Sequence, residues 1–242
     1  MTYYLIIKQF IKIEIIMTKS LLELEKDYYP VVERWLAQQY NCFQTGINTG
    51  LVQSRADVVG VRDVGGDFSG EIETIIVEVK RNKEPFATAS GQTFGYTVYA
   101  NRVYLADKRE NGFTQDEIMI ANHLGIGLIQ IDKNDKCSEI LTSPYYKPLT
   151  KFSIEFLHKL KLAKCQFCET YFTIGNDSNQ YANVTRENIK KAIEEERGIM
   201  FWQHKELWER KHKFQSEKRS QNLTYERRYL CSECTQLLFG QK

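Results

Sequence analysis

The sequence predicts an α/β fold, a mixed sheet flanked by helices, followed by a small zinc-finger module. Two β-branched runs, Arg55–Val64 and Glu71–Lys80, read as strands separated by the turn residues Gly65-Gly66-Asp67. Around them the first half of the chain reads as helix, three strands, helix, strand, helix and strand, an order typical of a mixed sheet with helices on its faces. The third observation is a pair of C-x-x-C motifs in the last third of the chain.

The other elements follow from local pattern. We expect a helical segment over residues 20–40 that restarts at Pro30, since proline suits a first helical turn, and Trp35, Leu36 and Tyr40 then form an apolar face. In chain order we further expect a short strand at 43–47, a helix at 86–100, a strand at 102–106, a helix at 115–124 and a strand at 127–132. Two glycines and several β-branched residues weaken the helix at 86–100.

The domain boundaries come from changes in composition. Residues 1–16 are expected to be an N-terminal extension, because Met17-Thr-Lys-Ser has the form of a second start. The main domain is expected over residues 17–135. Polar residues and two prolines then indicate a linker over residues 136–160. Residues 161–242 are expected to form the zinc-finger module, with a charged helical insert from about Thr185 onwards.

Composition excludes several classes of protein. The chain has 242 residues, of which 42% are hydrophobic and 26% are charged, so disordered, collagen-like and low-complexity classes are excluded. No apolar run approaches the ~20 residues that cross a bilayer. The hydrophobic stretch from Tyr3 to Ile16 is interrupted by Lys8, Lys12 and Glu14 and lacks a small-residue cleavage site, so we do not expect a signal peptide. We therefore expect a cytoplasmic protein with no membrane partner.

Charge is unevenly distributed along the chain. Residues 1–150 carry 16 Lys and Arg against 19 Asp and Glu, which leaves −3, whereas residues 151–242 carry 17 against 12, which leaves +5. A basic C-terminal part is expected if that part contacts a polyanion such as DNA. A solvated helical face explains the same charge equally well.

The most informative segment is Ile75-Ile76-Val77-Glu78-Val79-Lys80. Alternate residues of a strand share a face, so Glu78 and Lys80 project together while Val77 and Val79 face the core. If the preceding strand pairs through the glycine turn, Asp57 comes near Glu78. For Glu78 and Lys80 alone a surface-facing strand end is the favoured explanation, but Asp57 between hydrophobic residues shifts the balance towards a functional site.

Two neighbouring carboxylates repel each other unless a cation neutralises them. Oxygen ligands favour a hard ion such as Mg²⁺ (or Mn²⁺), which retains waters and binds one or two carboxylates. A metal-bound water loses a proton more easily, and the metal stabilises charge on a phosphoryl group. Lys80 adds a positive charge at the same place. The segment therefore suits hydrolysis of a phosphodiester.

These residues resemble the PD-(D/E)XK nuclease superfamily, whose signature is an acid on one strand and acid-x-lysine on the next. Asp57 matches the first acid and Glu78-Val79-Lys80 the second element, although Ala56 stands where the signature has proline. Gln92-Thr-Phe-Gly-Tyr96 resembles the Gln-x-x-x-Tyr element of the RecB-like branch. The resemblance covers roughly residues 20–132 and implies a restriction-endonuclease-like αβββαβ core.

The resemblance also implies roles for individual residues. Asp57 and Glu78 would ligate Mg²⁺ with the carbonyl of Val79 as a third ligand, and Lys80 would position or activate the attacking water. Gln92 would support the site, and Tyr96 is expected to pack. Members of the superfamily often carry a further acid on the first helix. Glu25, in Glu25-Lys-Asp-Tyr-Tyr-Pro-Val-Val, is preferred here, and Glu33 is the alternative.

The two C-x-x-C motifs predict a structural zinc site. Thiolates hold Zn²⁺ tetrahedrally, and two intervening residues let both sulfurs of a pair reach one ion. The ligands would be Cys165 and Cys168 with Cys231 and Cys234, in a treble-clef or ribbon-like finger interrupted by 62 residues. Four thiolates close the coordination sphere, so catalytic zinc is not expected. The alternative is two unrelated pairs of reduced thiols.

The insert within this module is basic and aromatic. Residues 205–228 contain eight Lys and Arg and four Glu, with aromatic residues among them, and His204 and His212 are expected at the surface. Cations neutralise phosphates, whereas the aromatic side chains are expected to pack the helices.

We therefore expect a metal-dependent deoxyribonuclease whose zinc finger aids DNA binding. One alternative is a non-catalytic DNA-binding or adaptor module on the same fold, and another is a zinc-dependent protein-interaction scaffold. The sequence leaves open the cut-site preference, endo- or exonuclease action, partner proteins and the formation of a homodimer.

Overall fold

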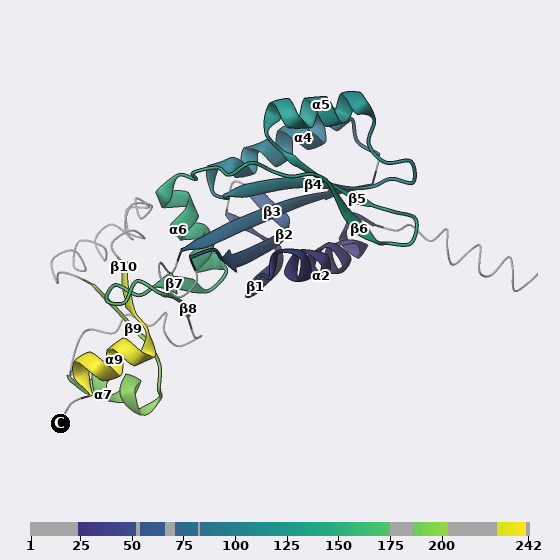
Figure 1. Ribbon diagram of the computed structural model, residues 1–242. Helices are drawn as coiled ribbons and strands as arrows, with labels where there is room; N and C mark the ends of the chain where they lie inside the picture. The colour runs from purple at the N-terminus through teal and green to yellow at the C-terminus, as the bar shows by residue number, and fades with distance from the viewer. Residues whose placement is uncertain are drawn as a thin grey trace, which may run out of the picture.

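The computed structural model describes residues 24–51, 54–65, 71–81, 83–174, 186–202 and 227–240. A six-stranded mixed sheet occupies most of the first part of the chain, with its strands in sequence order (Figure 1). The strands are β1 (Gln44–Leu51), β2 (Ser54–Asp63), β3 (Ile72–Lys80), β4 (Arg102–Lys108), β5 (Gly127–Ile131) and β6 (Cys137–Leu141). The main domain is thus an α/β unit, as the sequence predicts.

The strand directions explain how the chain builds the sheet. β1, β2 and β3 form an antiparallel meander, and β6 returns antiparallel to β5. β3, β4 and β5 run parallel, so each connection between them must cross over a face of the sheet. Helices make both crossovers: α4 (Phe86–Gly95) and the short helix η2 (Tyr96–Val98) join β3 to β4, and α5 (Gln115–Leu124) joins β4 to β5.

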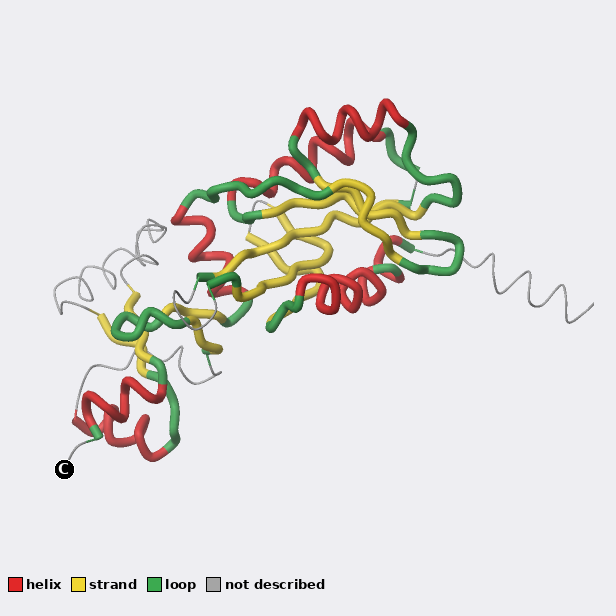
Figure 2. Tube along the Cα trace, viewed as in Figure 1, coloured by secondary structure: helices red, strands yellow, loops and turns green. Residues whose placement is uncertain are grey.

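Helices cover both faces of the sheet (Figure 2). The short helix η1 (Glu25–Asp27) leads into α2 (Tyr29–Tyr40), which packs on one face, while α4 and α5 lie on the other. Pro30 lies in the first turn of α2, as expected, and Asn41 ends the helix in the left-handed conformation. α5 begins with a capping box between Thr114 and Glu117 and ends at Gly125.

Two cores result from the alternation of side chains along the central strands. Val77 and Val79 of β3 pack under α2, whereas Ile76 packs against the layer of α4, α5 and the later helix α6 (Thr150–Lys159). Since both faces are covered, Glu78 and Lys80 share the buried face of Ile76 and do not face solvent. The predicted alternation of side chains on β3 is confirmed, and the face of Glu78 and Lys80 is buried as well.

In the part of the C-terminal module that the structure describes, the chain forms two small sheets and two helices. β7 (Leu162–Lys164) pairs with β8 (Tyr171–Thr173), and β9 (Ile199–Trp202) pairs with β10 (Arg227–Leu230), both antiparallel. α7 (Arg186–Glu194) packs beside the terminal helix α9 (Ser232–Phe239) (Figure 1). An isolated backbone β-bridge between Cys165 and Tyr229 joins the first hairpin to β10.

The structure replaces the expected linker at residues 136–160 with folded elements. β6 is the edge strand of the main sheet, and α6 with its C-cap Leu160 adds Phe156, Leu157 and Leu160 to the core that also contains residues of α4 and α5. Leu162 of β7 belongs to the same core. The sheet and the first hairpin of the C-terminal module are therefore packed together through α6. Prolines and polar residues mark only the loop between β6 and α6.

Smaller differences concern the ends of elements. β1 covers residues 44–51 where a strand at 43–47 was expected, and the helix expected at 86–100 ends at Gly95 and tightens into η2. Residues 66–70 of the glycine turn and the proposed extension at 1–16 lie outside the described residues. Within the described residues, none of the helices has the length and apolar character that crossing a bilayer requires.

Candidate functional site

Asp57 and Glu78 meet where β2 and β3 stop pairing. The paired register of the two strands ends at Val58 opposite Val77, and Asp57 and Glu78 come next along each strand. The backbone N–H of Val79 donates to Asp57 Oδ2 over 2.8 Å. A carboxylate from β2 thus lies against the main chain of β3 beside Glu78, which is the neighbourhood that the sequence predicts.

Lys80 lies on the same face of β3 as Glu78 and forms an ion pair with it. The Nζ of Lys80 is 2.9 Å from Glu78 Oε1, and the two residues are only 6% and 2% exposed. Buried charges of this kind are stable only when paired. Because Lys80 closes the strand, its ammonium group lies at the end of β3 where β4 also ends, at Asp107 and Lys108.

A tyrosine hydroxyl orients each of the two carboxylates. Tyr29, at the start of α2, donates to Asp57 Oδ1 over 2.5 Å. Tyr96, the first residue of η2, lies 2.6 Å from Glu78 Oε2 and 2.9 Å from the carbonyl oxygen of Arg55. Tyr96 is 1% exposed and packs in the core, as expected, but it also contacts the carboxylate.

Two further carboxylates approach Lys80 from outside the strands. Glu25 Oε2 lies 4.0 Å from the ammonium nitrogen, and Glu84 Oε2 lies 3.5 Å from it. Glu25 belongs to η1, which precedes α2, and Glu84 lies four residues after Lys80 in the chain. Together with Glu78, they surround one lysine with three acids. We call Asp57, Glu78, Lys80, Glu25 and Glu84 the carboxylate–lysine cluster.

Burial and mutual repulsion control the protonation of this cluster. Burial raises the pKa of Asp57, although the hydrogen bonds from Tyr29 and Val79 oppose the rise. Burial and the nearby charge of Asp57 raise the pKa of Glu78. Burial disfavours the charge on Lys80, but its hydrogen bond and the surrounding acids outweigh this effect and raise its pKa. Lys80 is therefore a fixed cation beside two acids that ionise reluctantly.

Not every predicted residue joins the cluster. Gln92 lies on α4 with its side chain exposed, and in the described part of the chain it has no hydrogen bond to the cluster. Glu33 lies on α2 and makes no ion pair with Lys80 among the described residues, so Glu25 is the acid that approaches it. Tyr29 and Glu84 were not predicted. Tyr29 belongs to the quoted motif around Glu25, but the sequence gives no sign of its contact with Asp57, 28 residues away.

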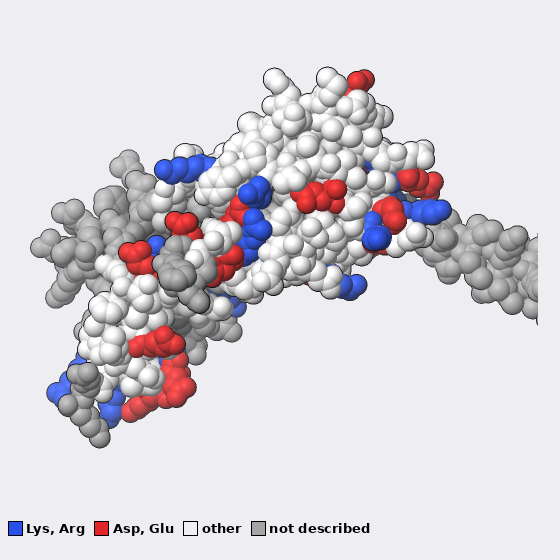
Figure 3. All heavy atoms as spheres, viewed as in Figure 1, with Lys and Arg blue, Asp and Glu red and all other residues white. Residues whose placement is uncertain are grey.

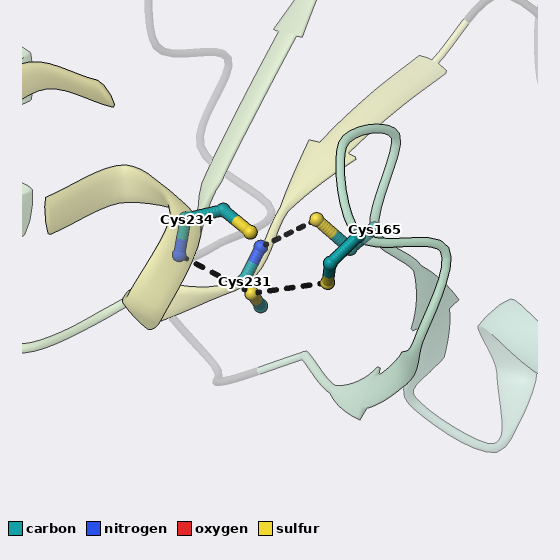
Figure 4. A group of neighbouring side chains, drawn as sticks. Cys165, Cys231 and Cys234 are labelled. Carbon is teal, nitrogen blue, oxygen red and sulfur yellow. Dashed lines mark hydrogen bonds between the residues drawn. The ribbon is translucent and has the colours of Figure 1, made fainter. Parts of the chain in front are cut away.

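The four cysteines form a second cluster, which we call the cysteine cluster. The sulfurs of Cys165, Cys168, Cys231 and Cys234 all lie within 4.8 Å of one another. Cys165 begins the turn between β7 and β8, and Cys231 is the N-cap of α9, with Cys234 in its first turn (Figure 4). The four thiols are close enough to bind a metal ion such as zinc.

Backbone groups also face these sulfurs. The N–H of Cys231 lies 3.4 Å from the sulfur of Cys165, and the N–H of Cys234 lies 3.4 Å from that of Cys231. Burial raises the pKa of Cys231 and Cys234. Burial also opposes ionisation of Cys168, but hydrogen bonds with Thr170 lower its pKa to about 6. N–H donors that face sulfur stabilise thiolates, which is the form that binds metal.

Comparisons with known proteins add little to this geometry. No family model matches the chain, and no curated protein matches it. A solved structure described as the SPO1766 protein of unknown function, from Silicibacter pomeroyi, is similar to part of it. The similarity has a TM-score of 0.42 and 19% sequence identity, over 57% of this chain and 86% of that one. The site must therefore be interpreted from its own residues.

Most of the basic insert predicted from the sequence lies outside the described residues. Residues 203–226, which contain most of its lysines and arginines as well as His204 and His212, lie outside the described residues. Only the backbone of Arg227 and Arg228 is described, in β10.

Proposed function

We propose that the protein is a metal-dependent deoxyribonuclease that hydrolyses phosphodiester bonds at the carboxylate–lysine cluster. The observation that carries the proposal is the convergence of Asp57, Glu78 and Lys80 from two neighbouring strands. Burial raises the pKa of Asp57, burial and the charge of Asp57 raise that of Glu78, and the surrounding acids raise that of Lys80. Such perturbation in a cluster of charges favours a functional site over an ordinary surface ion pair.

The donor set suits a hard divalent cation. Asp57 and Glu78 offer only oxygen, and Mg²⁺ or Mn²⁺ binds through one or two carboxylates while retaining water. Each carboxylate oxygen has two lone pairs, so the bonds from Tyr29 and Tyr96 leave acceptor capacity for a cation. We assign Asp57 and Glu78 as its ligands, with Val79 as a main-chain ligand. When bound, the ion would supply an activated water and stabilise charge on the phosphoryl group.

The protein's own groups then have separable roles. Tyr29 and Tyr96 hold the two carboxylates in fixed orientations, and rigid ligands reduce the reorganisation that the reaction requires. Lys80 supplies a positive charge for the phosphate oxygens. Because the acids around it raise its pKa, Lys80 stays protonated and acts by its charge. Glu25 and Glu84 hold the ammonium group in place.

The test is cleavage of DNA by zinc-loaded protein with Mg²⁺ or Mn²⁺ added or omitted, which avoids chelators that would also strip the cysteine cluster. We expect Lys80→Met, which keeps the apolar stem, to retain the fold and DNA binding but to lose about 100- to 1000-fold in cleavage rate. Lys136→Met, in the exposed turn between β5 and β6, is the matched control. Cleavage by Lys80→Met at the wild-type rate would disprove the proposal. Binding without cleavage by the wild type would favour a non-catalytic DNA-binding module.

We further propose that the cysteine cluster holds one structural Zn²⁺. Four sulfurs match the closed coordination of structural zinc, and a C-x-x-C turn facing a helix N-terminus resembles a treble-clef finger. We expect about one zinc per chain by elemental analysis, and loss of that zinc in Cys234→Ser. Cys42→Ser is the control, since this cysteine lies on the α2 side of the sheet and should leave the zinc content unchanged. Full zinc retention by Cys234→Ser would exclude this ligand set.

A further inference from the structure

A cleft lies between the main sheet and the C-terminal module, at the opposite end of β3 from the carboxylate–lysine cluster. It has a volume of about 640 Å³, within the size range of ligand pockets. Its walls are the starts of β3 and β4, the loop before α6, α6 itself, the β7–β8 hairpin and Tyr229 of β10. Six residue steps of about 3.3 Å separate Thr74, in the wall, from Lys80, so the two sites lie about 20 Å apart along β3.

The cleft is lined by two lysines and one glutamate, and further lysines lie nearby in the chain. Residues 147–164 contain five lysines and one glutamate, and four of these lysines are exposed. Lys147 and Lys164 line the cleft itself, where Glu169 forms an ion pair with Lys164 over 3.2 Å. In Figure 3 a basic group lies over the end of the molecule that carries α6, and basic and acidic groups adjoin at the boundary with the C-terminal module. This segment favours an anionic ligand.

The cleft also offers an aromatic face and neutral hydrogen-bonding groups. The side chain of Tyr145 lines it and is 61% exposed, in the same loop as Lys147. Ser153 and Gln166 line it from α6 and from the C-x-x-C turn. A site for a nucleotide combines three features: a cation for the phosphate, an aromatic surface for the base and polar groups for the edges of the base.

The walls are held rigidly. Phe156 and Leu157 of α6 and its C-cap Leu160 belong to the core of the main sheet, and the loop before α6 is fixed by hydrogen bonds between Asn101 and Tyr146 in both directions. The apolar side of α6 is thus used inside the protein. An amphipathic helix that binds lipid must expose that side, so the lysines do not mark a membrane-binding helix.

We propose that this cleft binds an unpaired nucleotide of a DNA strand, with its phosphates at Lys147 and Lys164 and its base against Tyr145. An unpaired base is required because the faces of a base within a duplex are already stacked. The inference rests on the proposed function for the choice of DNA as the polymer. It concerns binding alone, so it is tested without cleavage.

The experiment measures anisotropy of a labelled single-stranded oligonucleotide and of its duplex, with zinc-loaded protein and no Mg²⁺ or Mn²⁺. We expect Tyr145→Ala to weaken single-strand binding roughly five- to hundredfold and to leave duplex binding unchanged, while Tyr145→Phe retains the stack. The double variant Lys147→Gln/Lys164→Gln should weaken single-strand binding and reduce its salt slope by about 1.4, since each lost phosphate contact contributes about 0.7.

Lys133→Gln/Lys136→Gln, in the β5–β6 turn, removes the same charge far from the cleft in sequence and should bind as the wild type does. Zinc content and thermal melting of every variant show that it is folded. Equal losses on duplex and single strand, or no loss in either cleft variant, would overturn the proposal. So would binding to anionic phosphatidylserine vesicles in place of DNA. If the wild type binds single strands through Tyr145 yet never cleaves DNA, the proposed function fails and this inference stands.

Discussion

At the scale of single residues, the two carboxylates of the carboxylate–lysine cluster cost folding free energy. Asp57 and Glu78 are buried near each other, and their pKa values are raised, so their ionised forms cost folding free energy. The hydroxyl groups of Tyr29 and Tyr96 recover part of that cost by donating to the charged oxygens. A protein without a use for paired acids would gain stability by replacing them.

The pH dependence of stability follows from the direction of these shifts. A carboxyl whose folded pKa is raised binds its proton at a higher pH when folded than when unfolded, so stability falls as pH rises from about 4 through the folded pKa. We expect Asp57→Asn/Glu78→Gln to be more stable than the wild type near neutral pH without divalent metal. The difference should shrink on acidification towards pH 4. Thermal melting across pH checks this, and a double variant less stable at every pH would contradict it.

The sequence predicted which strand residues of this cluster come together, but not their other contacts. Asp57, Glu78 and Lys80 stand out because charges interrupt apolar strands, which is visible in a single sequence. Tyr29 and Glu84 do not stand out, since a tyrosine after a short helix or an acid in a loop is ordinary. Their roles arise only when the chain brings η1, α2 and β3 together. Gln92, which the motif suggested, lies exposed.

At the scale of elements, two glycines show opposite requirements. Gly125 ends α5 with a φ of +74°, and a Cβ there would collide with the hydroxyl of Tyr146, which donates to the carbonyl oxygens of Leu124 and Gly125. Gly91 lies inside α4, where a Cβ would meet nothing within 4 Å. The first glycine is required by its turn, while the second only adds flexibility to a helix.

We therefore expect Gly125→Ala to destabilise the protein by about 1–2 kcal/mol from backbone conformation alone, and more if Tyr146 is displaced. Gly91→Ala should stabilise it by about 0.5–1 kcal/mol, because alanine favours a helix interior. Denaturant unfolding of both variants provides the measurement. Equal effects would mean that the turn after α5 does not constrain the chain as described.

The sequence analysis missed β6 and α6, whose structure depends on contacts with distant parts of the chain. Residues 136–160 read as a linker because Pro144, Pro148 and polar side chains accumulate there. β6 is too short for its sequence pattern to predict a strand, and it is stabilised by pairing with β5. The apolar residues of α6 show a helical spacing, but their place in the sheet core depends on packing that no local pattern encodes. By contrast, the two C-x-x-C motifs predicted the cysteine cluster correctly, because the spacing within each pair is visible in the sequence.

At the scale of the whole molecule, α6 joins the two parts of the chain. Phe156 is fully buried in the core of the main sheet, and Leu162 in the first hairpin of the C-terminal module belongs to the same core. Hydrogen bonding continues the connection, since the N–H of Ile174 donates to the carbonyl oxygen of Lys161. The described parts are therefore expected to unfold together around α6.

Limited proteolysis tests this coupling. We expect trypsin to cut the native protein slowly after Lys151 and Lys159, because cleavage requires α6 to unfold. Phe156→Ala should cost about 3–5 kcal/mol and expose both sites. Fragment masses over time, with Cys42→Ser as a core-neighbouring control, provide the readout. Rapid cutting of the wild type at these lysines would restore the linker interpretation.

β3 begins in the wall of the cleft and ends in the carboxylate–lysine cluster, and its neighbours on both sides hold it in register. Under the two proposals, a DNA strand bound in the cleft at one end of β3 and hydrolysed at the carboxylate–lysine cluster at the other end would be cut at a constant distance from the bound nucleotide. The fragments released from any branched or frayed substrate would then share one length.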